Sequence, residues 1–151
     1  MRIFKISILL LLICAFFACK KSSHPSPDNS LSATVDGLPW VSSGSYITIS
    51  KSPGIQLSIG ADSSATHIRL YIGNYIGKGK YIISDSGTTA TYVNYYNGAG
   101  VVTHKATSGE IVVTGDTSVN NGPTYINGTF RFLGDTISVE NGLFAVKLDL
   151  N

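Results

Sequence analysis

Cysteine is nearly absent from this sequence of 151 residues, which contains only Cys14 and Cys19. Both lie near the N-terminus, so the rest of the chain can form neither a disulfide bond nor a thiolate metal site. A domain formed by the rest of the chain must therefore be held together by its hydrophobic core alone.

Charge is also scarce, at 13% of the residues, and the formal net charge is only +2. Arg2 and Lys5 lie in an N-terminal segment that we expect to be removed, which leaves nine basic and nine acidic residues. No run of like charge is longer than Lys20-Lys21, whereas binding to nucleic acid requires clustered Lys and Arg. The sequence therefore predicts no nucleic-acid partner.

Long apolar runs are missing except for one near the N-terminus, which extends from Ile6 to Phe17 (ISILLLLICAFF). A membrane-spanning helix needs about 20 apolar residues, whereas a run of this length is typical of the centre of a signal peptide. Arg2 and Lys5 supply the positive charges that precede such a centre. We therefore expect residues 1–18 to be a signal peptide.

The end of this segment, Phe16-Phe17-Ala18-Cys19, resembles the lipobox of bacterial lipoproteins. The resemblance implies that the thiol of Cys19 receives a diacylglyceryl group and that cleavage leaves Cys19 as the first residue. Two acyl chains give stable anchoring, where one chain would give only marginal binding. The alternatives are an ordinary secretory peptide that happens to precede a cysteine, or an anchor that is not cleaved.

The residues after Cys19 form a polar segment, Lys20 to Ser30 (KKSSHPSPDNS), with two prolines and four serines. Such a composition cannot bury apolar surface and favours an extended chain. We therefore expect residues 19–30 to comprise the lipidated cysteine and a flexible tether, with a reach of at most ~35–40 Å. His24 in this segment is expected to be solvated.

Helical spacing over more than two turns is missing from Leu31 onward, where apolar residues alternate with polar ones instead. Ile55, Leu57 and Ile59 show this period of two, which places them on one face of a strand. Phe144, Val146 and Leu148 show it too, and we expect them to face the core from the last strand. Gly, Asn and Pro turns separate the runs. The strands are expected near residues 32–35, 45–50, 55–60, 66–72, 79–84, 89–96, 101–107, 109–114, 125–133, 136–140 and 143–150. The pattern predicts one all-β domain at residues 31–151, an antiparallel β-sandwich or flattened barrel of about nine to eleven short strands.

Two stretches carry a resemblance to a known family. One is Ala33 to Trp40 (ATVDGLPW), and the other comprises Ile126 to Phe132 (INGTFRF) and Ile137 to Leu148 (ISVENGLFAVKL). Both resemble a family of small Bacteroidota-type lipoproteins of unknown function. The resemblance implies an all-β extracytoplasmic domain and carries over no activity and no catalytic residue.

Aromatic residues suggest where a ligand could bind. Trp40 can close one end of the core, or it can serve as a stacking platform for a ligand. Tyrosines are enriched, and by parity Tyr92, Asn94 and Tyr96 share one strand face. Arg69 and Tyr71 share another, opposite a row of aliphatic residues. Exposed aromatic rings beside amides and Arg suit the recognition of sugars or peptides. The alternative is that these rings form cross-strand pairs that only stabilise the sheet.

Residues for catalysis or metal binding are few. His67 and His104 are read as ordinary residues of strand faces, and no G-x-S-x-G motif is present. Residues 115–122 have oxygen ligands at alternate positions but lack the closing Glu of a calcium loop. We therefore expect no catalytic residue, no metal ion and no cofactor.

These observations favour a lipid-anchored envelope protein that is a non-enzymatic binding or structural module. Its expected partners are the membrane, through the lipid on Cys19, and a glycan or protein. The first alternative is a small hydrolase acting on glycans or peptides, which would show two convergent carboxylates or a His within bonding distance of Ser or Asp. The second is a carrier of an apolar ligand, which would show an unfilled apolar interior.

The first residues of the tether indicate in which membrane the protein resides. Lipoproteins of the resembled type that stay in the inner membrane have an Asp after the cysteine, whereas this chain has Lys20-Lys21. We expect an outer-membrane lipoprotein that faces the periplasm rather than the cell surface. Asp135-Thr136-Ile137 resembles a short O-glycosylation motif of exported proteins of this group, which makes Thr136 a candidate for modification.

Overall fold

The computed structural model describes residues 29–50, 56–84, 87–96, 100–118 and 124–148, and these residues form ten strands and no helix. No helix in these ranges is therefore long and apolar enough to cross a membrane. The strands are β1 (Ser30–Val35), β2 (Leu38–Val41), β3 (Gly44–Ser50), β4 (Gln56–Ser63), β5 (Thr66–Ile72), β6 (Gly79–Ile82), β7 (Thr88–Tyr96), β8 (Gly100–Ser118), β9 (Thr124–Gly134) and β10 (Ser138–Leu148).

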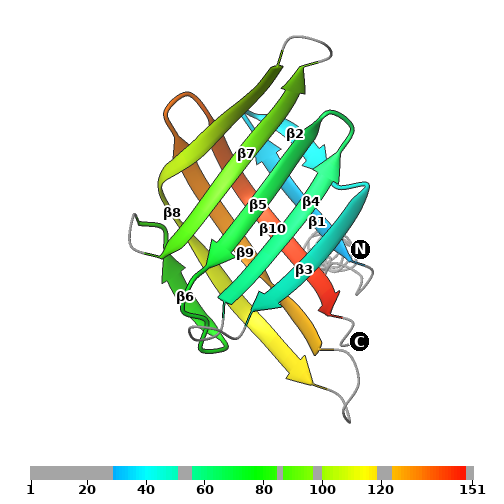
Figure 1. Ribbon diagram of the computed structural model, residues 1–151, viewed down its shortest axis with the longest axis vertical. Helices are drawn as coiled ribbons and strands as arrows, with labels where there is room; N and C mark the ends of the chain where they lie inside the picture. Colours follow the sequence, from blue (N-terminus) through cyan, green and yellow to red (C-terminus); the bar gives the residue numbers. More distant parts are fainter. Residues whose placement is uncertain (1–28, 51–55, 85–86, 97–99, 119–123, 149–151) are drawn as a thin grey trace, which may run out of the picture.

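All strand pairs in the described residues are antiparallel, and they join into one continuous sheet. The order is β2-β1-β10-β9-β8-β7-β5-β4-β3, with β6 paired to β8. The sheet curls into a half-barrel with two facing layers, as Figure 1 shows: β3, β4, β5 and β7 form the front layer, and β1, β2, β9 and β10 form the back layer. The predicted sandwich or flattened barrel is confirmed.

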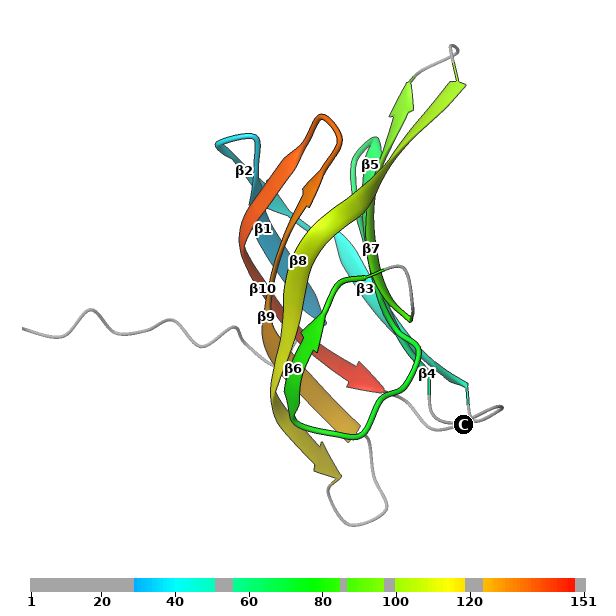
Figure 2. The same cartoon turned by 90° about the vertical axis from the view of Figure 1, so that its left-hand side faces the viewer.

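Strand β8 connects the two layers. Its first residues pair with β7 as far as Lys105, and from Ala106 onward it pairs with β9 (Figure 2). The register shifts between Ala106 and Ser108, and Gly109 has a positive φ of 145°. A bulge of this kind bends a strand and lets it pass from one sheet to another. The prediction of two strands here, 101–107 and 109–114, was wrong because the bulge bends one long strand without ending it.

Two further strand predictions needed correction. The strands expected at 136–140 and 143–150 are the single strand β10, in which Asn141 adopts a φ of 51° at a register shift. Strand β2 was not predicted, because Pro39 beside the Asp36-Gly37 turn favours a loop. Proline is tolerated there because β2 lies at the edge of the sheet, where a missing N–H breaks no ladder.

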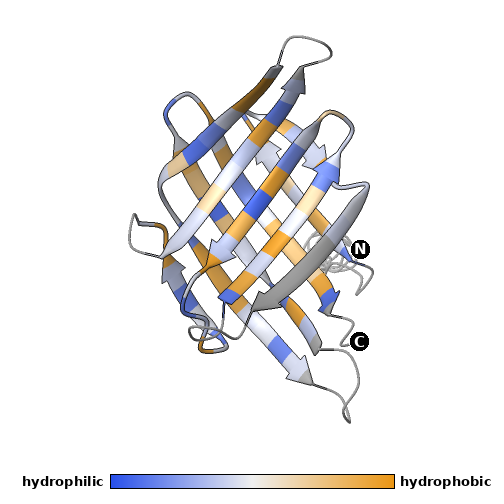
Figure 3. Cartoon of the chain, viewed as in Figure 1, coloured by the Kyte–Doolittle hydropathy of each residue, from blue (hydrophilic) through white to orange (hydrophobic). Residues whose placement is uncertain are grey.

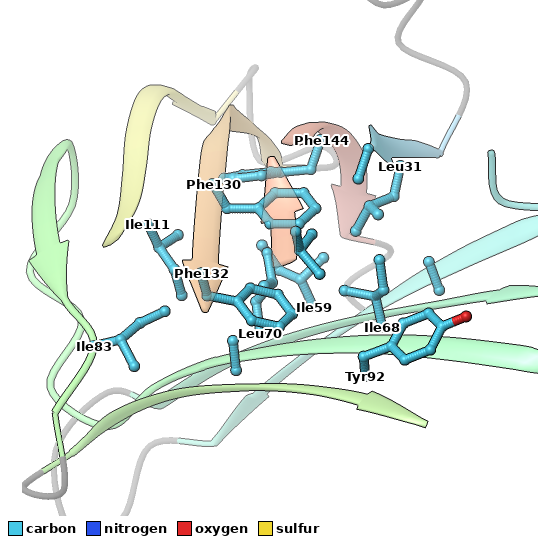
Figure 4. Close-up of a cluster of buried hydrophobic side chains, with 14 of the residues drawn as sticks. Leu31, Ile59, Ile68, Leu70, Ile83, Tyr92, Ile111, Phe130, Phe132 and Phe144 are labelled. Carbon is cyan, nitrogen blue, oxygen red and sulfur yellow. The ribbon is translucent and has the colours of Figure 1, made fainter. Parts of the chain in front are cut away.

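The core fills the space between the layers. Figure 4 shows Phe130, Phe132 and Phe144 of the back layer packed with aliphatic side chains of the front layer such as Leu70. The alternation of hydropathy along the strands is visible in Figure 3. Phe144 and Val146 are buried as predicted, whereas the side chain of Leu148 lies outside the described residues.

Trp40 lies in this core, at the end of β2. Its indole N–H donates to Oγ1 of Thr66 at 2.7 Å, and that hydroxyl donates to the carbonyl oxygen of Ser63 at 2.8 Å. The bond ties β2 of the back layer to the β4–β5 turn of the front layer. This geometry favours the core-closing role of Trp40 over the stacking platform.

Candidate functional site

An open groove of 390 Å³ lies on the outer face of the front layer. Strand alternation creates its lining, because Ile68, Leu70 and Ile72 point into the core and the residues between them point outward. The register places side chains of β4, β5 and β7 side by side on this face. The residues that line the groove are Asp62, His67, Arg69, Thr91, Val93 and Tyr95.

A hydrogen-bonded pair forms one end of this groove. Nδ1 of His67 lies 2.8 Å from Oδ1 of Asp62, which is its direct partner across the β4–β5 hairpin. The two side chains differ in exposure, at 10% for His67 and 58% for Asp62. The pair therefore holds an imidazole in a fixed orientation while presenting carboxylate oxygens to solvent as hydrogen-bond acceptors.

Arg69 and Tyr95 add a positive charge and an aromatic ring to the lining of the groove. The side chain of Arg69 is exposed, opposite Thr91 of β7, and Tyr95 is 43% exposed in the same groove, on the other side of His67. Tyr71 is half-buried on the same face, two residues along β5. The groove thus joins a guanidinium, a carboxylate, a hydroxyl and an aromatic ring over one short stretch of sheet.

The predicted group of Tyr92, Asn94 and Tyr96 does not belong to this groove. Tyr92 points to the inner face, where it is buried opposite Ile68, and its ring centroid lies 6.2 Å from that of His104. Asn94 is half-buried, and the side chain of Tyr96 lies outside the described residues. The structure therefore separates the two predicted groups onto opposite faces of the sheet.

The second histidine lies near the β9–β10 turn. Nδ1 of His104 is 3.1 Å from Oγ1 of Thr136 and 3.5 Å from Oδ1 of Asp135. Both neighbours approach the same ring nitrogen, so they do not form a relay through the imidazole. Thr136 is exposed at this turn, and its modification stays a prediction.

Asp116, the acidic residue of the stretch considered for calcium, has a partner within the chain. The hydroxyl of Tyr75 donates to its Oδ2 at 2.6 Å. Burial raises the pKa of Tyr75, and the bond to Asp116 raises it further, so this hydroxyl stays protonated. Residues 119–122 of this stretch lie outside the described residues. Among the residues that the structure describes, no group of three or more His, Cys, Asp or Glu side chains could hold a metal ion.

Sequence reasoning missed two charged groupings. The predicted strand 55–60 ended before Asp62, whereas β4 continues to Ser63 and brings Asp62 opposite His67. Extending that strand by its period of two would have found the pair. The second grouping lies on the back layer, where Glu110 joins Lys80 and Arg131. No local pattern links these three residues, which come from three separate strands.

Comparison with known proteins places the chain in a family. A family model described as a domain of unknown function, DUF6252, matches residues 28–146. The chain belongs to the DUF6252 family. The matched region of this DUF6252 protein contains nearly all of the described strands. Neither the comparison with curated proteins nor that with solved structures gives a match.

Proposed function

We propose that this DUF6252 protein is a lipid-anchored envelope protein whose β domain binds glycans on the outer face of its front layer. The observation that carries the proposal is the groove in which Arg69 and Tyr95 lie beside the Asp62–His67 pair. The Phe16-Phe17-Ala18-Cys19 motif supports the lipid anchor.

The chemistry of the groove matches that of a sugar. Vicinal hydroxyl groups both donate and accept hydrogen bonds, and here the carboxylate of Asp62 accepts while the guanidinium of Arg69 donates. Tyr95 adds an apolar ring with a polar tip, which can contact the C–H face of a pyranose. The groove is open to solvent rather than enclosed, so it suits a section of a longer chain better than a small molecule that must be surrounded.

The proposed location is the outer membrane, with the domain facing the periplasm. Lys20 and Lys21 follow the anchor directly, and basic residues beside a lipid anchor are attracted to anionic headgroups by about 1 kcal/mol each. The domain would then stand close to the membrane surface, within reach of envelope polymers.

The anchor is tested by replacing Cys19 with alanine. We expect the variant to lose all incorporation of radiolabelled palmitate and to leave the membrane fraction, because two acyl chains supply the anchoring free energy. The matched control is Cys14→Ala, which should keep both label and membrane retention. Membrane retention by Cys19→Ala equal to that of the wild type would contradict the proposal.

Glycan binding is tested with the full chain in detergent and a panel of glucose, mannose and N-acetylglucosamine hexasaccharides. We expect Arg69→Gln and Asp62→Asn each to weaken binding of the preferred sugar by tenfold or more, because each removes a charge-assisted hydrogen bond. Lys78→Gln, a change in an exposed loop on a different part of the surface, should leave affinity unchanged. Isothermal titration calorimetry gives the affinities. Equal weakening by all three variants, or no binding to any sugar, would refute the groove as the site.

A hydrolase is the second candidate, because the Asp62–His67 distance is one that such an enzyme requires. If the protein is a hydrolase, incubating the hexasaccharides with it should produce new reducing ends, and His67→Ala should lose this hydrolytic activity. The binding proposal predicts that the sugars are recovered intact. The carrier is disfavoured by the large apolar side chains that occupy the space between the layers.

A further inference from the structure

On the outer face of the back layer, we infer a second binding site, which takes an acidic peptide through Arg131. The site is independent of the glycan groove, because it lies on the opposite layer of the half-barrel. It is built from β8, β9 and β10 around a single arginine that the fold holds in place.

Arg131 on β9 is oriented by a charge network that includes one residue of β8 and one of β6. Its Nε donates to Oε1 of Glu110 at 3.0 Å, and Nζ of Lys80 lies 2.8 Å from Oε2 of the same carboxylate. The bond from Lys80 lowers the pKa of Glu110, and the charge of Arg131 lowers it further, so the carboxylate stays ionised. Both oxygens of Glu110 are thus occupied by two cations, and the three side chains together carry one net positive charge.

The terminal nitrogens of Arg131 remain available. The side chain is 69% exposed, and within the described residues its hydrogen bond to Glu110 uses Nε alone. A guanidinium held by one edge presents its other donors in a fixed plane, which is the geometry that a carboxylate accepts in two parallel bonds.

A bulge in β10 shapes the surface around this arginine. Phe132 pairs with Val139 and Phe130 pairs with Gly142, so Glu140 and Asn141 both lie opposite Arg131. Two residues facing one is the mark of a β-bulge, which redirects side chains and occurs often beside functional sites. Glu140 and Asn141 line two different grooves, and Arg131 lines both.

Two grooves follow from this arrangement, and Glu110 and Arg131 line both. One has a volume of 370 Å³ and includes Leu133 and Glu140, and the other has 430 Å³ and includes Asn141 and Leu143. An anion is repelled by Glu140 in the first groove. In the second, the amide of Asn141 adds a donor beside the guanidinium, so the carboxylate of the ligand belongs there.

The lining favours a peptide over a sugar. Leu133 is 52% exposed in one groove and Leu143 forms a wall of the other, so apolar contacts flank the charged centre on both sides. Among the lining residues in the described part of the chain, no exposed aromatic ring offers a platform for a pyranose. A short peptide with an Asp or Glu between two aliphatic residues would match this arrangement, because its carboxylate would meet Arg131 and its aliphatic side chains would meet the leucines on either side.

The test uses the full ¹⁵N-labelled chain in detergent and the probe acetyl-Leu-Asp-Leu-amide, with acetyl-Leu-Asn-Leu-amide as its neutral match. We expect the acidic probe to shift the backbone amide signals of residues 129–133 and 140–143, and to bind at least tenfold more tightly than the neutral probe. Arg131→Gln should abolish this preference, while Glu110 keeps Lys80 as its partner. Lys105→Gln, which removes an exposed positive charge on β8 outside both grooves, should preserve it.

A second variant separates binding from folding. Glu140→Gln should bind the acidic probe about threefold to tenfold more tightly, because it removes a repelling charge, and a damaged fold would not produce such a gain. Equal affinity for the two probes, or amide shifts confined to β5 and β7, would overturn the site. Tighter binding of trigalacturonate than of the peptide at residues 129–143 would overturn the peptide as its ligand.

Discussion

Replacing Phe144 with alanine will lower the free energy of unfolding by about 3–5 kcal/mol. The side chain is fully buried on β10, and its ring centroid lies 6.5 Å from that of Phe130 on β9. The substitution removes apolar burial and leaves a cavity that the surrounding sheet cannot close, because both layers are fixed by their strand ladders. A loss of this size is a large part of the stability of a domain that has no disulfide.

The measurement is denaturant unfolding followed by fluorescence, for which Trp40 is the chain's single tryptophan and lies in the core. Ile82→Ala serves as the control, because its side chain is 57% exposed and its truncation should cost less than about 0.5 kcal/mol. A cost below about 1 kcal/mol for Phe144→Ala would mean that the inner face of β10 is wrongly assigned.

Gly128→Ala will destabilise the domain by about 3 kcal/mol or more, although it adds a single methyl group. Gly128 lies opposite Phe144 on β10 and Val113 on β8. A Cβ at this position would overlap the carbonyl oxygen of Val112 and come within 2.6 Å of Cζ of Phe144. The clash with the carbonyl is the costly one, because the backbone of a central strand cannot move without breaking its ladder.

Gly79→Ala is the matched comparison, since a Cβ there meets no atom within 4 Å. We expect this variant to keep its stability to within about 0.5 kcal/mol, because an exposed strand position accepts alanine without strain. The same unfolding experiment compares the two variants. Equal stabilities would show that the close approach of β8 and β10 around Gly128 is absent in solution.

Much of the fold could be predicted because the residues on the buried face of a strand are apolar and recur at every second position of the sequence. Phe144 and Val146 were assigned to the core in this way, and Arg69 was assigned to the opposite face from its aliphatic neighbours. Two of the errors fall where one residue breaks the period, at the bulges beside Gly109 and Asn141, because a bulge looks in sequence like the end of a strand.

The candidate sites were less predictable because their residues meet across strands. Asp62 and His67 are only five residues apart, yet their contact depends on where the β4–β5 turn begins. Arg131 and Glu110 are separated by 21 residues, and their pairing depends on the register between β8 and β9. The same residues at another register would be ordinary surface charges.

The sequence by itself therefore determined that the protein is all-β and which residues of most strands are buried, and its resemblance to a lipobox near Cys19 stays a prediction. These are local properties, since a period of two and a short apolar run can be read from neighbouring residues. Only the tertiary structure decided that β8 spans both layers, that the tyrosines divide between two faces, and that Arg131 is held by Glu110. Those features depend on strand order and register, which arise from contacts between residues far apart in the chain.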